Sequence, residues 1–185
     1  ADMDFVAPPF IAEAVARRAA HGVFGYTLEP ESYFEAAIGW LARRHGWAVE
    51  RPWLVSAPGV VQTLSAAIVA ASAPGDRIVI QPPVYYPFAL RIRANGREVV
   101  ENPLVLDGDR YRMDVPGLER ALADGARVLV LCSPHNPGGR AWTCGELEPV
   151  VAACARHGAA IVSDEIHADL VLDGRRAFGL TGIAP

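Results

Sequence analysis

The sequence contains no lysine, because all seventeen of its basic residues are arginine. A reaction that needs a lysine amine, or a phosphate-binding loop of the GxxxxGKS/T type, is therefore excluded for these 185 residues taken alone. Long apolar runs are missing too. Segments such as 66–71 and 150–155 are far shorter than the ~18 residues that predict a transmembrane helix. We therefore expect no membrane partner.

A surplus of positive charge is also missing. Seventeen basic residues against twenty-one acidic ones give a net charge of −4, and no long run of either sign occurs. A surface for nucleic acid is therefore not indicated. Cys132, Cys144 and Cys154 are odd in number and lack CxxC spacing, which predicts neither a disulfide framework nor a metal site. A reducing cytoplasm is the expected compartment.

What the sequence does contain is enough apolar surface to fold. Hydrophobic residues make up 51% and charged residues 21% of the chain, far from the composition of a disordered protein. At roughly 150 residues per domain, the length predicts one compact domain or a piece of a larger one. The chain begins Ala1-Asp2 with neither an initiator methionine nor a signal peptide, so we expect an internal segment of a longer protein.

Helical and strand-like patterns alternate along most of the chain. Helices are expected at residues 11–20, 31–45, 60–72, 86–94, 115–123 and 144–157, and strands at 53–56, 77–80, 97–100, 127–132 and 159–163. Thr143 and Glu146 have the spacing of a capping box at the start of the last helix. The alternation predicts an α/β fold with a mainly parallel sheet and helices on both faces. Ligands of such sheets bind beyond the carboxyl ends of the strands.

Two of the expected strand ends are followed by residues that could bind a ligand. Gly59 opens a helix after residues 53–56, and the free N–H groups there could hold a phosphate, although a simple turn would have the same sequence. Tyr85 and Tyr86 follow residues 77–80, where one ring could stack on a planar ligand or pack in the core.

The other two strand ends give the stronger signals. The loop SPHNPGGR at 133–140 is fixed by prolines and glycines and directs Asn136 toward the ligand side. The segment SDEIHAD at 163–169 places Asp164 at the end of an apolar run, where a carboxylate needs a cationic or donor partner. A metal, a magnesium nucleotide and a protonated ring nitrogen are the conceivable partners. The missing lysine excludes the nucleotide, and Asp164, His167 and Asp169 match no common metal-ligand spacing.

Taken in order, these segments, with ADMDF at 1–5 and GVFGYT at 22–27, resemble a known family. They are similar to the large domain of fold type I pyridoxal-phosphate enzymes, the class I/II aminotransferase superfamily, and particularly to its cystathionine β-lyase-like branch of C–S lyases. The resemblance covers essentially the whole chain. It implies an N-terminal arm and helix at 1–30, a partial cofactor-binding large domain at 31–185, and a small C-terminal domain that lies outside the sequence.

The resemblance also implies roles for individual residues. Asp164 would pair with the protonated pyridine nitrogen of pyridoxal 5'-phosphate, Asn136 would bind the phenolic oxygen, and Tyr85 would stack on the ring. His167 would lie near the ring. The cofactor phosphate would be held by the N–H groups of Gly59, Val60 and Val61, and by Tyr26 of a neighbouring subunit in a homodimer.

Further expectations concern the rest of the site. The Asn136–Pro137 bond is expected to be cis, Arg140 and Trp142 to brace the loop, and Glu165 and Asp169 to be solvated or structural. The cofactor-binding lysine of the family would follow residue 185 in a Ser-x-x-Lys segment. The 185 residues alone are therefore expected to bind the cofactor weakly and to be inactive, with no catalytic residue of their own.

Three functions are compatible with this resemblance. The first is a C–S β-lyase that converts cystathionine or another cysteine S-conjugate into a thiol, pyruvate and ammonia. The second is an aminotransferase that passes the amino group to a 2-oxo acid. The third is a non-catalytic truncated scaffold, which rests only on the missing lysine.

Overall fold

A four-stranded parallel sheet forms the centre of the computed structural model, which describes residues 4–171, 179 and 180. The strand order is β2-β1-β5-β6, and each neighbouring pair is parallel. The strands are β1 (Arg77–Ile80), β2 (Glu98–Glu101), β5 (Ala126–Cys132) and β6 (Ala160–Asp164). The predicted fold class and four of the five predicted strands are confirmed.

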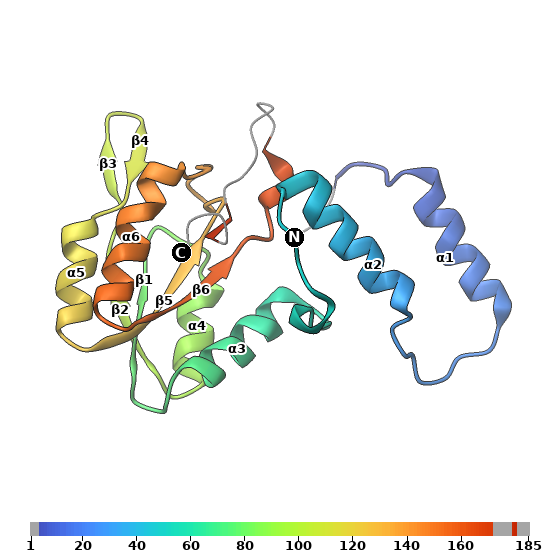
Figure 1. The fold of residues 1–185 in the computed structure, drawn as a ribbon, viewed down its shortest axis with the longest axis horizontal. Coiled ribbons are helices and arrows are strands. Elements are labelled where there is room, and N and C mark those ends of the chain that lie inside the picture. The colour runs from blue at the N-terminus through green and yellow to red at the C-terminus, as the bar shows by residue number, and fades with distance from the viewer. Residues whose placement is uncertain (1–3, 172–178, 181–185) are drawn as a thin grey trace.

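Helices cover both faces of this sheet (Figure 1). The helices α3 (Val60–Ala71) and α4 (Pro87–Ala94) pack on one face, and α5 (Val115–Ala123) and α6 (Cys144–Arg156) pack on the other. Strand β5 supplies both cores, because Val128 and Val130 face α3 and α4 while Leu129 and Leu131 face α5 and α6. A strand buried on both faces has no polar face, which explains the apolar run at 128–132 that follows the exposed Arg127.

Local signals explain where α6 begins. The Thr143 N–H donates to Glu146 Oε2 at 2.9 Å, and the Thr143 side chain accepts from the backbone of Glu146 in return. The predicted capping box is therefore confirmed. It satisfies donors that would otherwise be unpaired in the first turn of the helix.

A small hairpin of β3 (Val105–Asp107) and β4 (Arg110–Arg112) lies between β2 and α5, and the sequence did not predict it. Its strands have three residues each and are largely exposed, so no apolar alternation marks them. Gly108 in the turn has φ 62°, which favours glycine.

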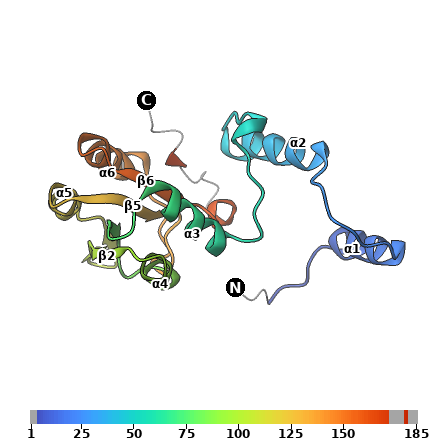
Figure 2. The same cartoon turned by 90° about the horizontal axis from the view of Figure 1, so that it is seen from below.

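The N-terminal helices lie to one side of the sheet and its covering helices (Figures 1 and 2). They are α1 (Pro9–His21) and α2 (Glu31–Trp40), and α2 continues into the π-helical turn η1 (Leu41–His45). Gly46, with φ 70°, ends this turn. No residue of α1 is buried, so this helix has little contact with the rest of the described chain.

The strand predicted at 53–56 is wrong. The chain forms the 3-10 helix η2 (Arg51–Trp53) and then runs extended to α3 without pairing with any strand in the described part of the chain. Trp53 and Val55 are exposed. Apolar residues alone do not make a strand, because a strand also needs a neighbour that accepts and donates its backbone hydrogen bonds.

Three further properties concern the chemistry that the described residues can support. Cys132, Cys144 and Cys154 are all free thiols. Among the described residues, no helix has the length and apolarity to cross a membrane, and no group of three or more His, Cys, Asp or Glu side chains is placed to hold a metal ion.

Candidate functional site

A pocket of about 310 Å³ lies where the carboxyl ends of β5 and β6 meet the amino end of α3 and the loop after β1. Its lining residues are Gly59, Val60, Val61, Gln62, Tyr85, Cys132, Asn136, Asp164, Ile166 and His167. Seven of the eight cofactor-binding residues predicted from the sequence are among them. The structure therefore brings segments from residue 59 to residue 167 together at one edge of the sheet.

The amino end of α3 presents free backbone donors to this pocket. The first hydrogen bond of the helix joins the Thr63 N–H to the Gly59 carbonyl at 3.0 Å, so the preceding N–H groups have no acceptor within the helix. No side chain caps this end. A Cβ atom on Gly59 would lie 2.8 Å from Gln62 Oε1, so glycine at this position lets the Gln62 side chain lie close to the helix end. Such an end is suited to an anion such as a phosphate.

Asp164 is the last residue of β6 and lies at the base of the pocket. Its side chain accepts a hydrogen bond from the Ile166 N–H at 3.1 Å, and the residue is only 9% exposed. No arginine or histidine of the described residues forms an ion pair with it. A buried carboxylate without a cationic partner is costly, so this position suits a ligand that brings a protonated nitrogen.

Tyr85 and Asn136 reach the pocket from two different loops. The Tyr85 ring is half-buried and meets the Phe88 ring edge to face, with 5.9 Å between centroids. The Asn136 N–H donates to Cys132 Sγ at 3.3 Å, and the Asn136–Pro137 bond is cis, as expected. The arrangement offers an aromatic ring for stacking and a carboxamide for hydrogen bonding.

The loop that contains Asn136 is braced from behind. Arg140 Nη1 donates to the Tyr111 carbonyl at 3.0 Å, and Arg140 also pairs with Glu146. The buried Trp142 donates its indole N–H to the Cys132 carbonyl at 3.0 Å. Arg140 and Trp142 therefore brace the loop, as the sequence predicted, and neither lines the pocket.

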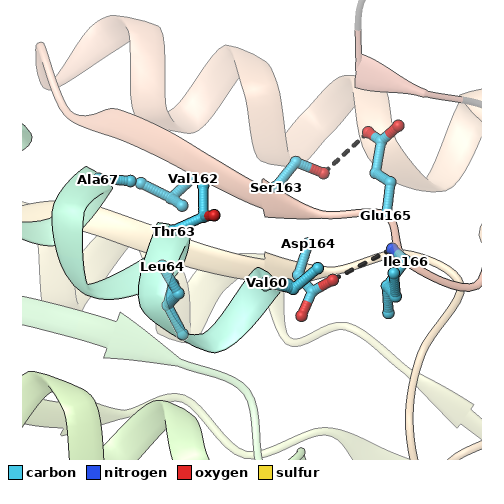
Figure 3. A pocket seen from close by; sticks show the side chains of 9 residues that line it. All are labelled: Val60, Thr63, Leu64, Ala67, Val162, Ser163, Asp164, Glu165 and Ile166. Carbon is cyan, nitrogen blue, oxygen red and sulfur yellow. Dashed lines mark hydrogen bonds between the residues drawn. The ribbon is translucent and has the colours of Figure 1, made fainter. Parts of the chain in front are cut away.

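A second pocket, of about 230 Å³, lies between α3 and β6 and shares Val60, Asp164 and Ile166 with the first (Figure 3). Most of its walls are apolar. Glu165 lies at its rim, where it accepts from the Ser163 hydroxyl at 2.9 Å and from the Leu180 N–H at 3.2 Å. Glu165 is thus a structural carboxylate, which agrees with the expectation.

Tyr26 is the one predicted site residue outside the pocket. It lies in the extended segment between α1 and α2, where its side chain is fully exposed. The sequence reasoning in turn missed Gln62, Cys132 and Ile166 as lining residues. Cys132 could have been predicted as a lining residue, because it ends the strand predicted at 127–132 and directly precedes the loop at 133–140.

The family model for aminotransferase class I and II matches residues 2–183, and the chain belongs to this family. It is 45% identical over 177 residues to the cystathionine beta-lyase PatB of Bacillus subtilis, covering 95% of this chain and 46% of that protein. It is 40% identical over 172 residues to protein MalY of Escherichia coli, covering 92% and 44% respectively. The chain thus spans about half the length of these relatives.

A solved structure agrees with the sequence relatives. The crystal structure of cystalysin from Treponema denticola, which contains a pyridoxal 5'-phosphate cofactor, matches with a TM-score of 0.94 and 33% identity. The match covers 100% of this chain and 47% of that structure. The α/β architecture described above is therefore shared with a protein that contains pyridoxal 5'-phosphate.

Proposed function

We propose that the whole protein is a pyridoxal 5'-phosphate-dependent C–S β-lyase that acts on a cysteine S-conjugate such as cystathionine. The observation that carries this proposal is the buried Asp164 carboxylate, which faces the pocket without a cationic partner among the described residues. The names of the relatives PatB and cystalysin support the choice of cofactor and reaction. The reaction adds one water to the conjugate and yields a thiol, pyruvate and ammonia.

The residues of the pocket fit this cofactor, which supplies an electron sink for the carbon next to the substrate amine. Asp164 would keep the ring nitrogen protonated by pairing with it. Asn136 would donate to the phenolic oxygen, and Tyr85 would lie on the face of the ring. His167 lines the same pocket and would lie near the ring.

The phosphate would be held at the amino end of α3. The N–H groups around Gly59, Val60 and Val61 lack helical acceptors, and the positive end of the helix favours an anion. No lysine occurs in the 185 residues, so this part of the chain holds and orients the cofactor while the covalent attachment must come from elsewhere. We expect the 185-residue segment by itself to be inactive.

An aminotransferase is the second candidate, since the family includes this activity in its name. The two reactions share the same cofactor contacts and differ in where the proton returns. Pyruvate release without an added 2-oxo acid identifies the lyase, and strict dependence on a 2-oxo acid identifies the aminotransferase.

We further propose a homodimer in which Tyr26 reaches the cofactor phosphate of the other subunit. The arm at 1–30 would then be a separate unit from the partial large domain at 31–185. The proposal is supported by large exposed apolar side chains in this arm, namely Phe5, Phe10, Phe24, Tyr26 and Leu28. The free thiols support a reducing compartment, the cytoplasm.

The test uses the whole protein and its Asp164→Asn variant, with Asp109→Asn in the exposed hairpin turn as the matched control. We expect the protein to bind pyridoxal 5'-phosphate and to release pyruvate from cystathionine without a 2-oxo acid. Asp164→Asn is expected to lose at least ~100-fold in turnover, because the neutral amide cannot hold the ring proton. Unchanged turnover in Asp164→Asn would contradict the assignment of Asp164, and absent cofactor binding would contradict the function itself.

A further inference from the structure

His135 precedes Asn136 in the same loop, and its side chain contacts the other loop, which brings Tyr85 to the pocket. His135 is 3% exposed, and its Nε2 atom lies 2.8 Å from the carbonyl oxygen of Pro83, which stands 52 positions earlier in the chain. Because a carbonyl oxygen can only accept, the Nε2 atom must carry the proton. The imidazole is therefore the Nε2–H tautomer and donates across the gap between the loops.

The orientation of this imidazole is fixed on other sides. It meets the Trp142 ring edge to face, with 5.6 Å between centroids. A Cβ atom on Gly138 would lie 2.9 Å from His135 Cδ2, so only a glycine allows this approach. The backbone of His135 is also held, since its N–H donates to the Arg140 carbonyl at 2.7 Å and its carbonyl accepts from the Gly139 N–H at 2.9 Å.

The Pro83 carbonyl is the group through which the His135 side chain holds the loop of Tyr85. Proline has no N–H, so the carbonyl is the only backbone hydrogen-bonding group that Pro83 can use. Pro83 stands two positions before Tyr85, and the Tyr85 carbonyl accepts from the Phe88 N–H at 3.1 Å on the other side. The loop is thus held at Pro83 by the His135 side chain and at Tyr85 by the Phe88 N–H, so hydrogen bonds fix the backbone at Tyr85 and two residues before it.

We propose that His135 is a positioning residue that ties the loop of Tyr85 to the loop of Asn136, so that the two side chains engage the cofactor as a unit. The inference rests on the proposed function, since the ligand is the same pyridoxal 5'-phosphate. His135 does not line the pocket and acts only through its neighbours. Stacking by Tyr85 and hydrogen bonding by Asn136 are then coupled through one buried hydrogen bond.

The test compares His135→Gln with His135→Asn in the whole protein. A glutamine amide can reach the position of Nε2 and keep the donor, whereas the shorter asparagine amide cannot. We expect His135→Asn to bind pyridoxal 5'-phosphate about tenfold more weakly and His135→Gln to stay within about twofold of the wild type. The exposed His157, changed to Asn, is the matched control and should leave binding unchanged.

Two readouts separate positioning from simple support of the fold. One is the dissociation constant of the cofactor, from a fluorescence titration. The other is the circular dichroism signal of the bound cofactor, which reports the orientation of its ring. This signal should become smaller in His135→Asn but not in the other variants. A double-mutant cycle completes the test. The effects of Tyr85→Ala and Asn136→Ala on the binding free energy should be non-additive in the wild type. In the His135→Asn background the two effects should add.

Each outcome decides the matter. Equal binding and equal dichroism in the Asn and Gln variants would overturn the role of His135 while leaving the proposed function intact. A wild-type protein that fails to bind pyridoxal 5'-phosphate would overturn the proposed function and this role with it. If His135→Asn does not fold, Gly138→Ala replaces it, because the added methyl group displaces the His135 ring without removing it. If Gly138→Ala binds the cofactor as tightly as the wild type, the proposal is also overturned.

Discussion

The indole N–H of Trp40 donates to both carboxylate oxygens of Asp169, at 3.1 and 3.0 Å, although 129 positions separate the two residues. His45 Nε2 donates to the same carboxylate at 2.8 Å. Asp169 lies in the 3-10 helix η3 (Ala168–Leu170), which follows the pocket-lining residues Asp164, Ile166 and His167. The end of the N-terminal helices is thereby attached next to the pocket.

Replacing Asp169 by alanine is expected to loosen this attachment. The acceptor is about half exposed, so the loss in unfolding free energy is expected to be about 1 kcal/mol or less. Hydrogen exchange of residues 31–45 should become faster while α5 and α6 keep their protection. Asp109→Ala, in the exposed hairpin turn, serves as the control, and equal exchange in both variants would show that Asp169 anchors nothing.

Removing the indole donor of Trp142 is expected to destabilise the protein. In Trp142→Phe the buried Cys132 carbonyl loses the indole donor, which costs about 1 kcal/mol of unfolding free energy. Urea denaturation of the protein without cofactor measures the change. Trp53→Phe is the matched control, because Trp53 is 59% exposed, and it should change stability by less than about 0.5 kcal/mol. Equal effects at the two positions would contradict the brace.

The three thiols are expected to differ in reactivity. Burial raises the pKa of Cys132 to about 11, and burial raises the pKa of Cys154 to about 11 as well. At pH 8 only about one in a thousand of these thiols is ionised, since the thiolate fraction falls tenfold per pH unit below the pKa. A thiol reagent followed by peptide mapping should modify Cys144 first; modification of Cys132 in the folded protein at the same rate would contradict its burial.

A nearby carboxylate is expected to control the reactivity of Cys144. The Cys144 thiol donates to Glu148 Oε1 at 3.2 Å, and this hydrogen bond raises the pKa of Cys144. Glu148→Gln removes the negative charge, so the pKa should fall and labelling at pH 8 should become faster. Glu119→Gln, whose carboxylate pairs with Arg156 instead, should leave the labelling rate of Cys144 unchanged. Slower labelling of Cys144 in Glu148→Gln would contradict the control of this thiol by Glu148.

Stability is expected to fall in mild acid because of His135. Burial lowers the pKa of His135 below its ordinary value of 6.5, so the folded state holds the neutral ring and the unfolded state binds the proton first. The contribution of His135 is therefore present above about pH 6.5 and is lost as the pH falls through the lowered pKa. Urea midpoints at pH 5 to 8 should decline less in His135→Gln than in the wild type. His157→Gln should follow the wild type.

Much of the fold and of the site could be predicted from the sequence because the signals are local. The apolar run at 128–132 in β5 predicts a strand buried on both faces, and Thr143 with Glu146 predicts the start of α6. Parallel strands present their carboxyl ends at one edge, so Asn136 and Asp164 could be expected to meet there. The resemblance to a known family then assigned the roles that residue types alone left open.

Other features are decided only in three dimensions. The segment after Trp53 has strand-like residues but no neighbouring strand among the described residues, and the hairpin at 105–112 has neighbours but no apolar alternation. Nothing in the sequence pairs His135 with Pro83 or Trp40 with Asp169, because each contact joins residues more than 50 positions apart. The sequence by itself determined periodicity, caps and turns, which depend on near neighbours along the chain. The tertiary structure decided the pairings, because hydrogen bonds between distant segments form only once the two cores have packed against the sheet.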